Sequence, residues 1–135
     1  MIIECVPPML VDKAWQHISP HLDKAIARNG GLTTHNQVWS RCMNGVSNLL
    51  LFVEDDEVKI TVVVTFEQVN GKTAAHVNFT CGGTIKLWQQ NMPLFKQWAK
   101  QHGAETVVVS GPADVYSRIF ERTKKLFTTY EMEIG

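Results

Sequence analysis

The feature that most constrains the fold is a strand, a glycine pair, a helix and a second strand that follow one another in the second half of the chain. Residues 77–83 read as the end of a strand closed by two glycines, and an amphipathic stretch follows from Thr84 to His102. Gly103 is suited to end that helix, and Thr106–Val109 is a β-branched run typical of a buried strand parallel to its neighbour. This predicts a β-turn-α-β unit, whose helix start presents backbone N–H groups that can bind an anion or a carbonyl.

Size and composition favour a single domain over residues 1–135. The 135 residues suffice for one core, and 44% apolar residues is within the globular range. Lys plus Arg and Asp plus Glu number 13 each, so the net charge of zero gives no general attraction for nucleic acid or anionic lipid. The first residues do not form a signal peptide, and no apolar run approaches membrane-spanning length. We expect a cytoplasmic protein without nucleic-acid or membrane partners.

The cysteines and histidines do not predict a metal centre. Cys5, Cys42 and Cys81 are odd in number and widely spaced, so they form neither a disulfide framework nor a metal knuckle, and they suit a reducing cytosol. His17 and His21 have the i, i+4 spacing that can hold a metal on a helix, but no third ligand is near. We interpret them as a solvent-facing pair and expect no metal site.

The remaining elements follow from hydrophobic periodicity and turn signals. The predicted order is strand 2–6, helix 11–28, helix 34–43, strands 48–54, 58–67 and 73–80, helix 84–102, strand 106–109, helix 115–124 and strand 126–134. Pro20 and Pro93 are expected to kink or divide their helices. An α/β fold follows: a mixed, mostly antiparallel central sheet with one β-α-β crossover and helices on both faces.

Side-chain alternation assigns inner faces to the later elements. In strand 73–80 we expect Ala75, Val77 and Phe79 to share one face. In the long helix the predicted inner stripe is Ile85, Trp88, Met92, Phe95, Ala99 and His102. Trp39 is the tryptophan that we expect to be exposed, as an anchor for a partner.

This order of elements resembles the GNAT superfamily of acetyl-CoA-dependent N-acetyltransferases over nearly the whole chain. The resemblance is carried by the helix end 95–104, the strand 105–109, the short helix 115–124 and the strand start 126–132. The small size and spare loops also resemble the GNAT-like proteins of tailed bacteriophages. For such a protein the resemblance implies a location in the host cytoplasm or in the virion.

The resemblance implies a cofactor loop to look for. GNAT members cradle the pyrophosphate of CoA with an Arg/Gln-x-x-Gly-x-Gly/Ala loop between strand and helix. The matching stretch, Thr80 to Lys86, has two glycines at another spacing and lacks the leading Arg or Gln, although Lys86 offers a positive charge. We interpret the glycine pair as a strand end and expect no cofactor. In the alternative interpretation, acetyl-CoA binds at Cys81, Gly82, Gly83, Thr84, Ile85 and Lys86.

The resemblance also implies a proton donor and a base. Many members donate a proton from a Tyr in the short helix, but Phe120 holds the matching position, and Tyr116 one turn earlier is the substitute. Glu67 and His76 are the candidate bases, expected to face each other across the hairpin. The alternative for both is a solvated strand end near a turn.

Two principal hypotheses of function follow. In the first, the chain is a catalytically degenerate GNAT-like protein that binds a protein partner, in phage virion assembly or host modulation. In the second, it is a divergent acetyl-CoA-dependent N-acetyltransferase that uses Glu67 or His76 as base and Tyr116 as acid. A sensor that binds CoA without turnover is a third option, and the oligomeric state, including a homo-oligomer, is left open.

Overall fold

The computed structural model describes residues 1–28, 33–109, 126 and 132–134. In chain order its elements are β1 (Ile2–Val6), the 3₁₀ turn η1 (Pro8–Leu10), α1 (Val11–Arg28), α2 (His35–Met43), β2 (Asn48–Glu54), β3 (Glu57–Val69), β4 (Lys72–Cys81), α3 (Ile85–Gln101) and β5 (Thr106–Val109). The predicted helix 115–124 and most of the predicted strand 126–134 lie outside the described residues.

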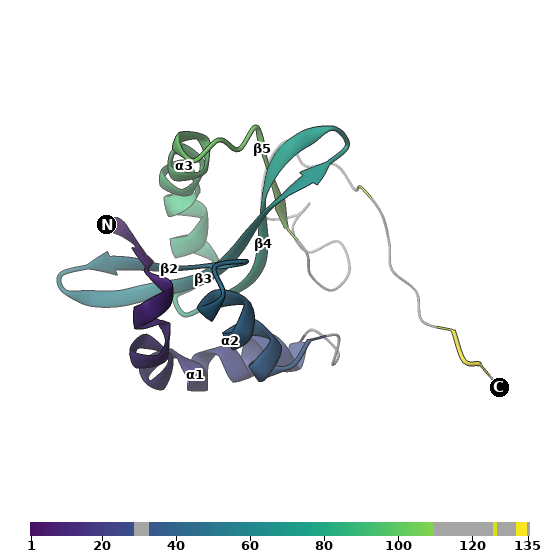
Figure 1. Cartoon of the computed structure of the whole chain (residues 1–135). Coiled ribbons are helices and arrows are strands. Elements are labelled where there is room, and N and C mark those ends of the chain that lie inside the picture. Colours follow the sequence, from purple (N-terminus) through teal and green to yellow (C-terminus); the bar gives the residue numbers. More distant parts are fainter. Residues whose placement is uncertain (29–32, 110–125, 127–131, 135) are drawn as a thin grey trace.

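The five described strands form one mixed sheet in the order β1-β2-β3-β4-β5 (Figure 1). β1 to β4 pair antiparallel as a meander, and β5 pairs parallel to β4 after the crossover through α3. Two tight turns set the meander, one with Asp55 and Asp56 and one with Asn70 and Gly71, all at positive φ. The predicted fold class is therefore confirmed.

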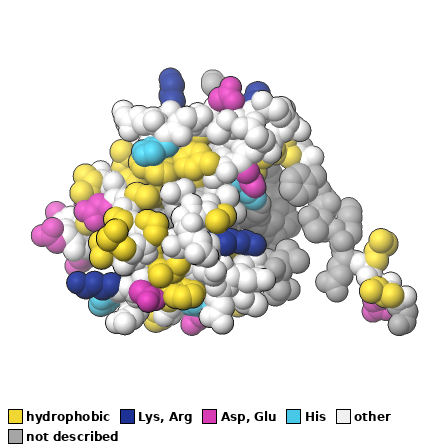
Figure 2. All heavy atoms as spheres, viewed as in Figure 1, with side chains coloured by type: hydrophobic (Ala, Val, Ile, Leu, Met, Phe, Trp, Pro, Cys, Tyr) yellow, Lys and Arg dark blue, Asp and Glu magenta, His cyan; other side chains and the backbone are white. Residues whose placement is uncertain are grey.

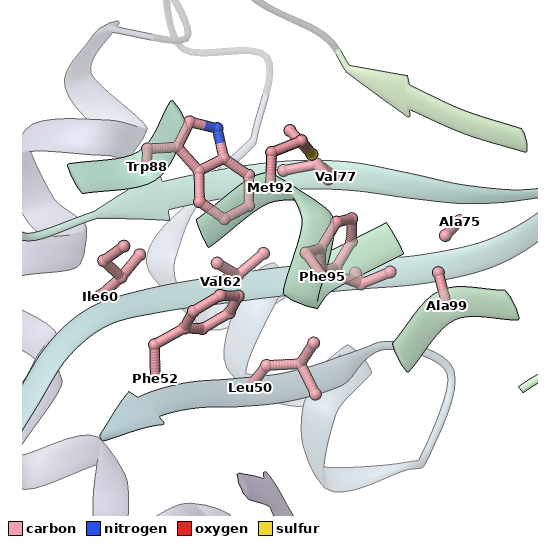
Figure 3. Packing of buried hydrophobic residues seen from close by; sticks show 11 residues of the cluster. Leu50, Phe52, Ile60, Val62, Ala75, Val77, Trp88, Met92, Phe95 and Ala99 are labelled. Atoms are coloured by element: carbon pink, nitrogen blue, oxygen red, sulfur yellow. The ribbon is translucent and has the colours of Figure 1, made fainter. Parts of the chain in front are cut away.

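Helices cover both faces of this sheet: α3 lies on one, and α1 and α2 lie on the other (Figure 1). Under α3 the core is a cluster of aromatic and aliphatic side chains (Figure 3). Its buried members are Leu50, Phe52, Ile60, Val62, Val64, Ala75, Val77, Trp88, Met92, Phe95 and Ala99. Phe95 is fully buried, and its ring lies 5.6 Å from that of Trp88 and 6.4 Å from that of Phe52. Each such side chain stabilises the fold by about 1.5–3 kcal/mol through burial.

A second cluster lies between the sheet and the α1–α2 pair. Its buried members are Val11, Ile18, Leu22, Ala25, Val38, Cys42, Leu49, Val63, Phe79 and Cys81. The predicted cap of α2 is confirmed, since the Thr34 hydroxyl accepts from the amide of Gln37 and the Gln37 side chain accepts from the amide of Thr34. Together the two clusters make the sheet a covered central layer.

Pro20 and Pro93 do not divide their helices, so division, one of the two expected outcomes, is wrong. Pro20 lies inside the single helix α1, and Pro93 lies inside α3. In α1, Ile18 and Leu22 are buried on either side of the proline, and in α3, Met92 and Phe95 are. Burial on both sides outweighs the lost hydrogen bond, because tertiary packing supplies most helix stability in proteins.

Several predicted exposures are wrong. Ile85 and His102, expected to face inward, are both exposed at the two ends of α3. β5, expected to be buried, is half-buried along its whole length. Trp39, expected to be exposed, is half-buried, and its indole N–H donates to Asp12 at 2.8 Å. Periodicity identifies the buried stripe of α3, but exposure at the ends of α3, along β5 and at Trp39 depends on neighbours in space.

Candidate site at the β4–β5 separation

β4 is longer than the part of it that pairs with β5. Ala74 to Val77 pair with Thr106 to Val109, while β4 continues through Asn78 to Cys81. Along these last residues of β4, no described strand pairs with the edge that faced β5. Among the described residues, the edge of β4 from Asn78 to Thr80 therefore has no strand neighbour.

A β-bulge at Asn78 changes the face of every later residue in β4. Val64 pairs with Val77 and Val63 pairs with Phe79, so Asn78 is the extra residue. Val77 faces α3, whereas Phe79 and Cys81 pack in the α1–α2 cluster. The prediction that Ala75, Val77 and Phe79 share one face is therefore wrong at Phe79.

The bulge also creates a polar network that the sequence did not predict. Thr65 donates its hydroxyl hydrogen to Asn78 Oδ1 at 2.6 Å, and the hydroxyls of Thr65 and Ser47 are 2.9 Å apart. Ser47 is only 3% exposed. The available signal was Asn78 itself, since asparagine is depleted in strand interiors and favours bulges and turns. This network fixes the strand at the bulge that follows the last described β4–β5 pair.

Glu67 and His76 lie together, as the sequence predicts. Glu67 Oε1 contacts His76 Nδ1 on the diagonal across the β3–β4 pair. The side chain of His76 is 18% exposed and that of Glu67 is 41% exposed, so the pair is half-covered rather than a fully solvated strand end. When Nδ1–H donates to Glu67, the imidazole is held in the tautomer whose Nε2 carries the lone pair. The role of Glu67 or His76 as a base stays a prediction.

The stretch Cys81 to Lys86 is a strand end and a helix cap. Cys81 is 6% exposed and packs in the α1–α2 cluster. Thr84 is the N-cap of α3, and its hydroxyl accepts from the amide of Leu87 at 3.1 Å. Ile85 and Lys86 are exposed in the first turn. Their two amides are the helix N–H groups to which no described residue provides an acceptor.

The two glycines are required by contacts with β3. Gly82 has φ +81°, and a Cβ there would lie 2.8 Å from the carbonyl oxygen of Lys59. At Gly83 (φ +69°) a Cβ would lie 2.9 Å from Leu87 Cδ2 and 3.3 Å from Ile60 Cγ1. Side chains at these positions would meet protein atoms and not open space. The glycine pair therefore lets the chain turn closely over β3.

This stretch departs from the family's pyrophosphate loop. Thr80 and Cys81, which would begin the cradling loop, still pair with Val62 and Thr61 of β3. Only residues 82–84 connect β4 to α3, and Thr84 is occupied as the cap. The connection is shorter than the family motif, and no described arginine follows the strand. For an anion the stretch offers the amides of residues 82–86, to which no described residue provides an acceptor, together with the Lys86 charge.

Other predicted site residues have simpler roles. His17 and His21 are both exposed on α1, and the described residues contain no group of three His, Cys, Asp or Glu side chains that could hold a metal ion. Tyr116 lies outside the described residues, so its role as acid stays a prediction.

Sequence reasoning missed a second histidine contact. His35, at the start of α2, lies 2.7 Å from Asp23 through Nε2, and its Nδ1 accepts from the indole N–H of Trp15 at 3.3 Å. Both ring nitrogens are engaged, so His35 joins α2 to α1 and is not an available base. Asp23 and His35 are far apart in sequence, which left no local signal.

Comparison with known proteins supports the fold assignment. No protein-family profile and no curated protein matches the chain in sequence. Among solved structures, a probable acetyltransferase is similar over 100% of this chain and 99% of its own, with a TM-score of 0.65 at 16% identity. A ribosomal-protein-alanine N-acetyltransferase from Brucella melitensis biovar Abortus 2308 has a TM-score of 0.65 at 12% identity and 98% coverage of both chains. Glucosamine-6-phosphate N-acetyltransferase from Arabidopsis thaliana has a TM-score of 0.54 at 14% identity and 97% coverage of both.

At these identities the similarity shows the fold alone, and that fold is GNAT-like. Of the helices that the structure describes, none combines the length and apolar character needed to cross a membrane.

Proposed function

We propose that this chain is a GNAT-like protein that has lost the standard acetyl-CoA chemistry and acts by binding a protein partner. The observation that carries the proposal is the junction of β4 and α3. There Thr80 and Cys81 remain in the strand ladder and the glycines pack on β3. The connection of residues 82–84 is shorter than the family's loop, and Lys86 is its one nearby cation among the described residues, whereas a diphosphate is usually bound by several converging donors and charges.

Calorimetric titration of the intact chain with acetyl-CoA tests this proposal. We expect no saturable binding up to about 1 mM, which corresponds to less than about 4 kcal/mol of binding free energy. A micromolar Kd that Lys86→Glu weakens at least about tenfold would contradict it, because loss of a cation at a phosphate is expected to cost that much. Gln90→Glu is the matched control, since Gln90 is an exposed residue one turn further along the same helix.

The biological setting belongs to the same proposal. The resemblance to phage-encoded proteins in size and loop length suggests virion assembly or host modulation. Packaging and portal genes beside the coding gene would support that setting. A metabolic or toxin–antitoxin neighbourhood would favour an enzyme.

A second candidate, a divergent N-acetyltransferase, is favoured by the Glu67–His76 pair. In this hypothesis Glu67 holds His76 so that Nε2 takes the proton from an amine acceptor, and the free amine attacks the thioester carbonyl. The edge of β4 beyond Val77 would then hold the rest of the cofactor. Tyr116 is the proposed acid for the departing thiolate.

A thiol-release assay over a panel of small amines and peptides distinguishes the two candidates. The enzyme hypothesis expects turnover that His76→Gln lowers by about 10²–10⁴-fold, the usual contribution of a general base. It also expects Glu67→Gln to alter kcat and its pH profile while KM changes less. A bulky residue at Gly83 is a poor test of cofactor binding, because it would collide with Leu87 whether or not a cofactor binds.

A further inference from the structure

The opposite edge of the sheet carries a surface that the β4–β5 site does not use. β1 is the outermost strand on that side, and no described strand pairs with its outer edge. It lacks the lysine or proline that guards many edge strands, and its Ile2 is 58% exposed. An edge of this kind presents N–H and C=O groups to which another extended segment can pair.

An apolar hollow lies beside this edge on the α3 face. It has a volume of about 250 Å³, and its walls come from the start of the chain and from Leu94 and Trp98 of α3, with Gln97 and Gln101 as its polar border. Met1 and Ile3 are only partly buried where they pack against the core under α3. Figure 2 shows hydrophobic side chains gathered on this face, between the N-terminal strand and α3. Such a hollow suits one apolar side chain of a pairing strand.

A second, acidic hollow adjoins the first. It measures about 360 Å³ and combines Met1, Ile2 and Val53 with three acidic residues of the β2–β3 turn: Glu54, Asp55 and Asp56. Met1 and Ile2 line both hollows, so the two share a wall. Lys59 is paired with Glu57 at 2.6 Å, and the negative charges of Glu54 and Asp55 add to the rise in its pKa, but none of the three carboxylates in the hollow forms a salt bridge among the described residues. The second hollow therefore favours a basic side chain.

We propose that the outer edge of β1, with these two hollows, is the docking site for an extended segment of a partner protein that carries an apolar residue close to a basic one. We name it the β1 edge site, defined by Met1, Ile2, Ile3, Leu94, Trp98 and the turn residues Glu54, Asp55 and Asp56. The segment adds a strand to the sheet, places its apolar side chain against Trp98 and sets its basic side chain among the turn carboxylates. This inference rests on the proposed protein-binding function and names the surface that performs it.

Fluorescence anisotropy with a labelled hexapeptide that alternates lysine and valine tests the site on the intact chain. We expect saturable binding that weakens steeply in 0.5 M salt, because the turn carboxylates are exposed and screened. A peptide with glutamate in place of lysine should bind at least about tenfold more weakly. A peptide N-methylated at alternate amides should lose binding, because it cannot complete the strand ladder.

Variants on the protein side keep the fold intact. Ile2→Lys puts a positive charge on the wall between the hollows and should weaken peptide binding at least about tenfold. Val46→Lys is the matched control, since Val46 is also 58% exposed but lines neither hollow, and it should leave binding unchanged. Equal effects of the two variants, or absence of binding at about 1 mM peptide, would overturn the proposal.

A second copy of the chain is the competing occupant. Light scattering that shows a dimer, converted to a monomer by Ile2→Lys, would assign the edge to self-association and overturn the partner proposal. Failure of the docking site is separable from failure of the proposed function. The first appears in peptide binding and its response to Ile2→Lys, and the second appears as acetyl-CoA binding.

Discussion

Different kinds of interaction hold the helices on the two faces of the sheet. Under α3, the interactions that fix the helix are burial and ring contacts among Phe52, Trp88, Phe95 and Trp98. Under α1 and α2, an aliphatic cluster is bordered by directional polar contacts. These are Ser47–Thr65–Asn78, Glu67–His76, Trp15–His35–Asp23 and Trp39–Asp12.

This difference separates stability from specificity in the fold. The free energy gained by apolar burial is large and does not depend on the relative orientation of the groups, so the α3 face supplies much of the free energy of folding. Hydrogen bonds contribute less net free energy, but they fix which groups meet, so the α1–α2 face sets the register and the bulge of β4. The candidate base lies on this second face, where its orientation is controlled.

The largest expected effect contrasts two phenylalanines on opposite faces. Phe95→Ala should lower the free energy of unfolding by about 3–5 kcal/mol, because a fully buried ring with three aromatic neighbours leaves a large cavity. Phe79→Ala, at a residue that is 7% exposed and lies next to the bulge, should cost less. Urea denaturation of both variants measures the difference. Equal losses would show that the two faces contribute alike.

A smaller effect is expected where β4 turns into α3. Gly82→Ala forces an alanine to positive φ and also places its Cβ against the Lys59 carbonyl, at a cost of about 1–3 kcal/mol. Gly71→Ala is the matched control, because Gly71 has φ +77° with nothing within 4 Å of the added carbon. Thermal unfolding should show the larger loss at Gly82. Similar losses would mean that the contact with β3 does not explain the glycine.

The polar network gives a third contrast within β3. Thr65→Val removes the hydroxyl between Ser47 and Asn78 and should cost about 1–2 kcal/mol, because two partly buried partners lose a hydrogen bond. Thr61→Val alters a residue on the same face that is 4% exposed and makes no side-chain hydrogen bond to the described residues. That variant should be close to neutral in urea denaturation. If Thr61→Val were as harmful as Thr65→Val, the network would have no special role.

The sequence predicted the larger features and missed those set by long-range contact. Local sequence patterns predict the order of strands and helices, the two tight turns and the Thr34 cap. The register of the hairpin predicts the Glu67–His76 contact. The bulge at Asn78 does not, because the extra residue depends on how β3 and β4 pair, and it reverses the faces of Phe79 and Cys81. The glycine pair does follow the end of β4, but the close approach to Lys59 that explains it is visible only in three dimensions.

The smallest effect concerns pH and Cys42 in α2. Burial, with a further contribution from Cys5, raises the pKa of the Cys42 thiol from an ordinary value of 9.0 to about 11. The folded state therefore keeps this thiol neutral at pH values where the unfolded chain ionises it. Its contribution to stability is complete below pH 9 and is lost as the pH rises towards about 11.

Urea midpoints at pH 8 and pH 10.5 for the native chain and for Cys42→Ala measure this contribution. Cys42→Ala should be less stable at pH 8, because it leaves a cavity, but it should lose less stability on going to pH 10.5. Phe95→Ala should keep the full pH dependence, because it leaves the α1–α2 face unchanged. Were the pH dependence the same for all three proteins, the Cys42 thiol would not be protected by burial under α2, and the two faces would not differ in their response to alkali.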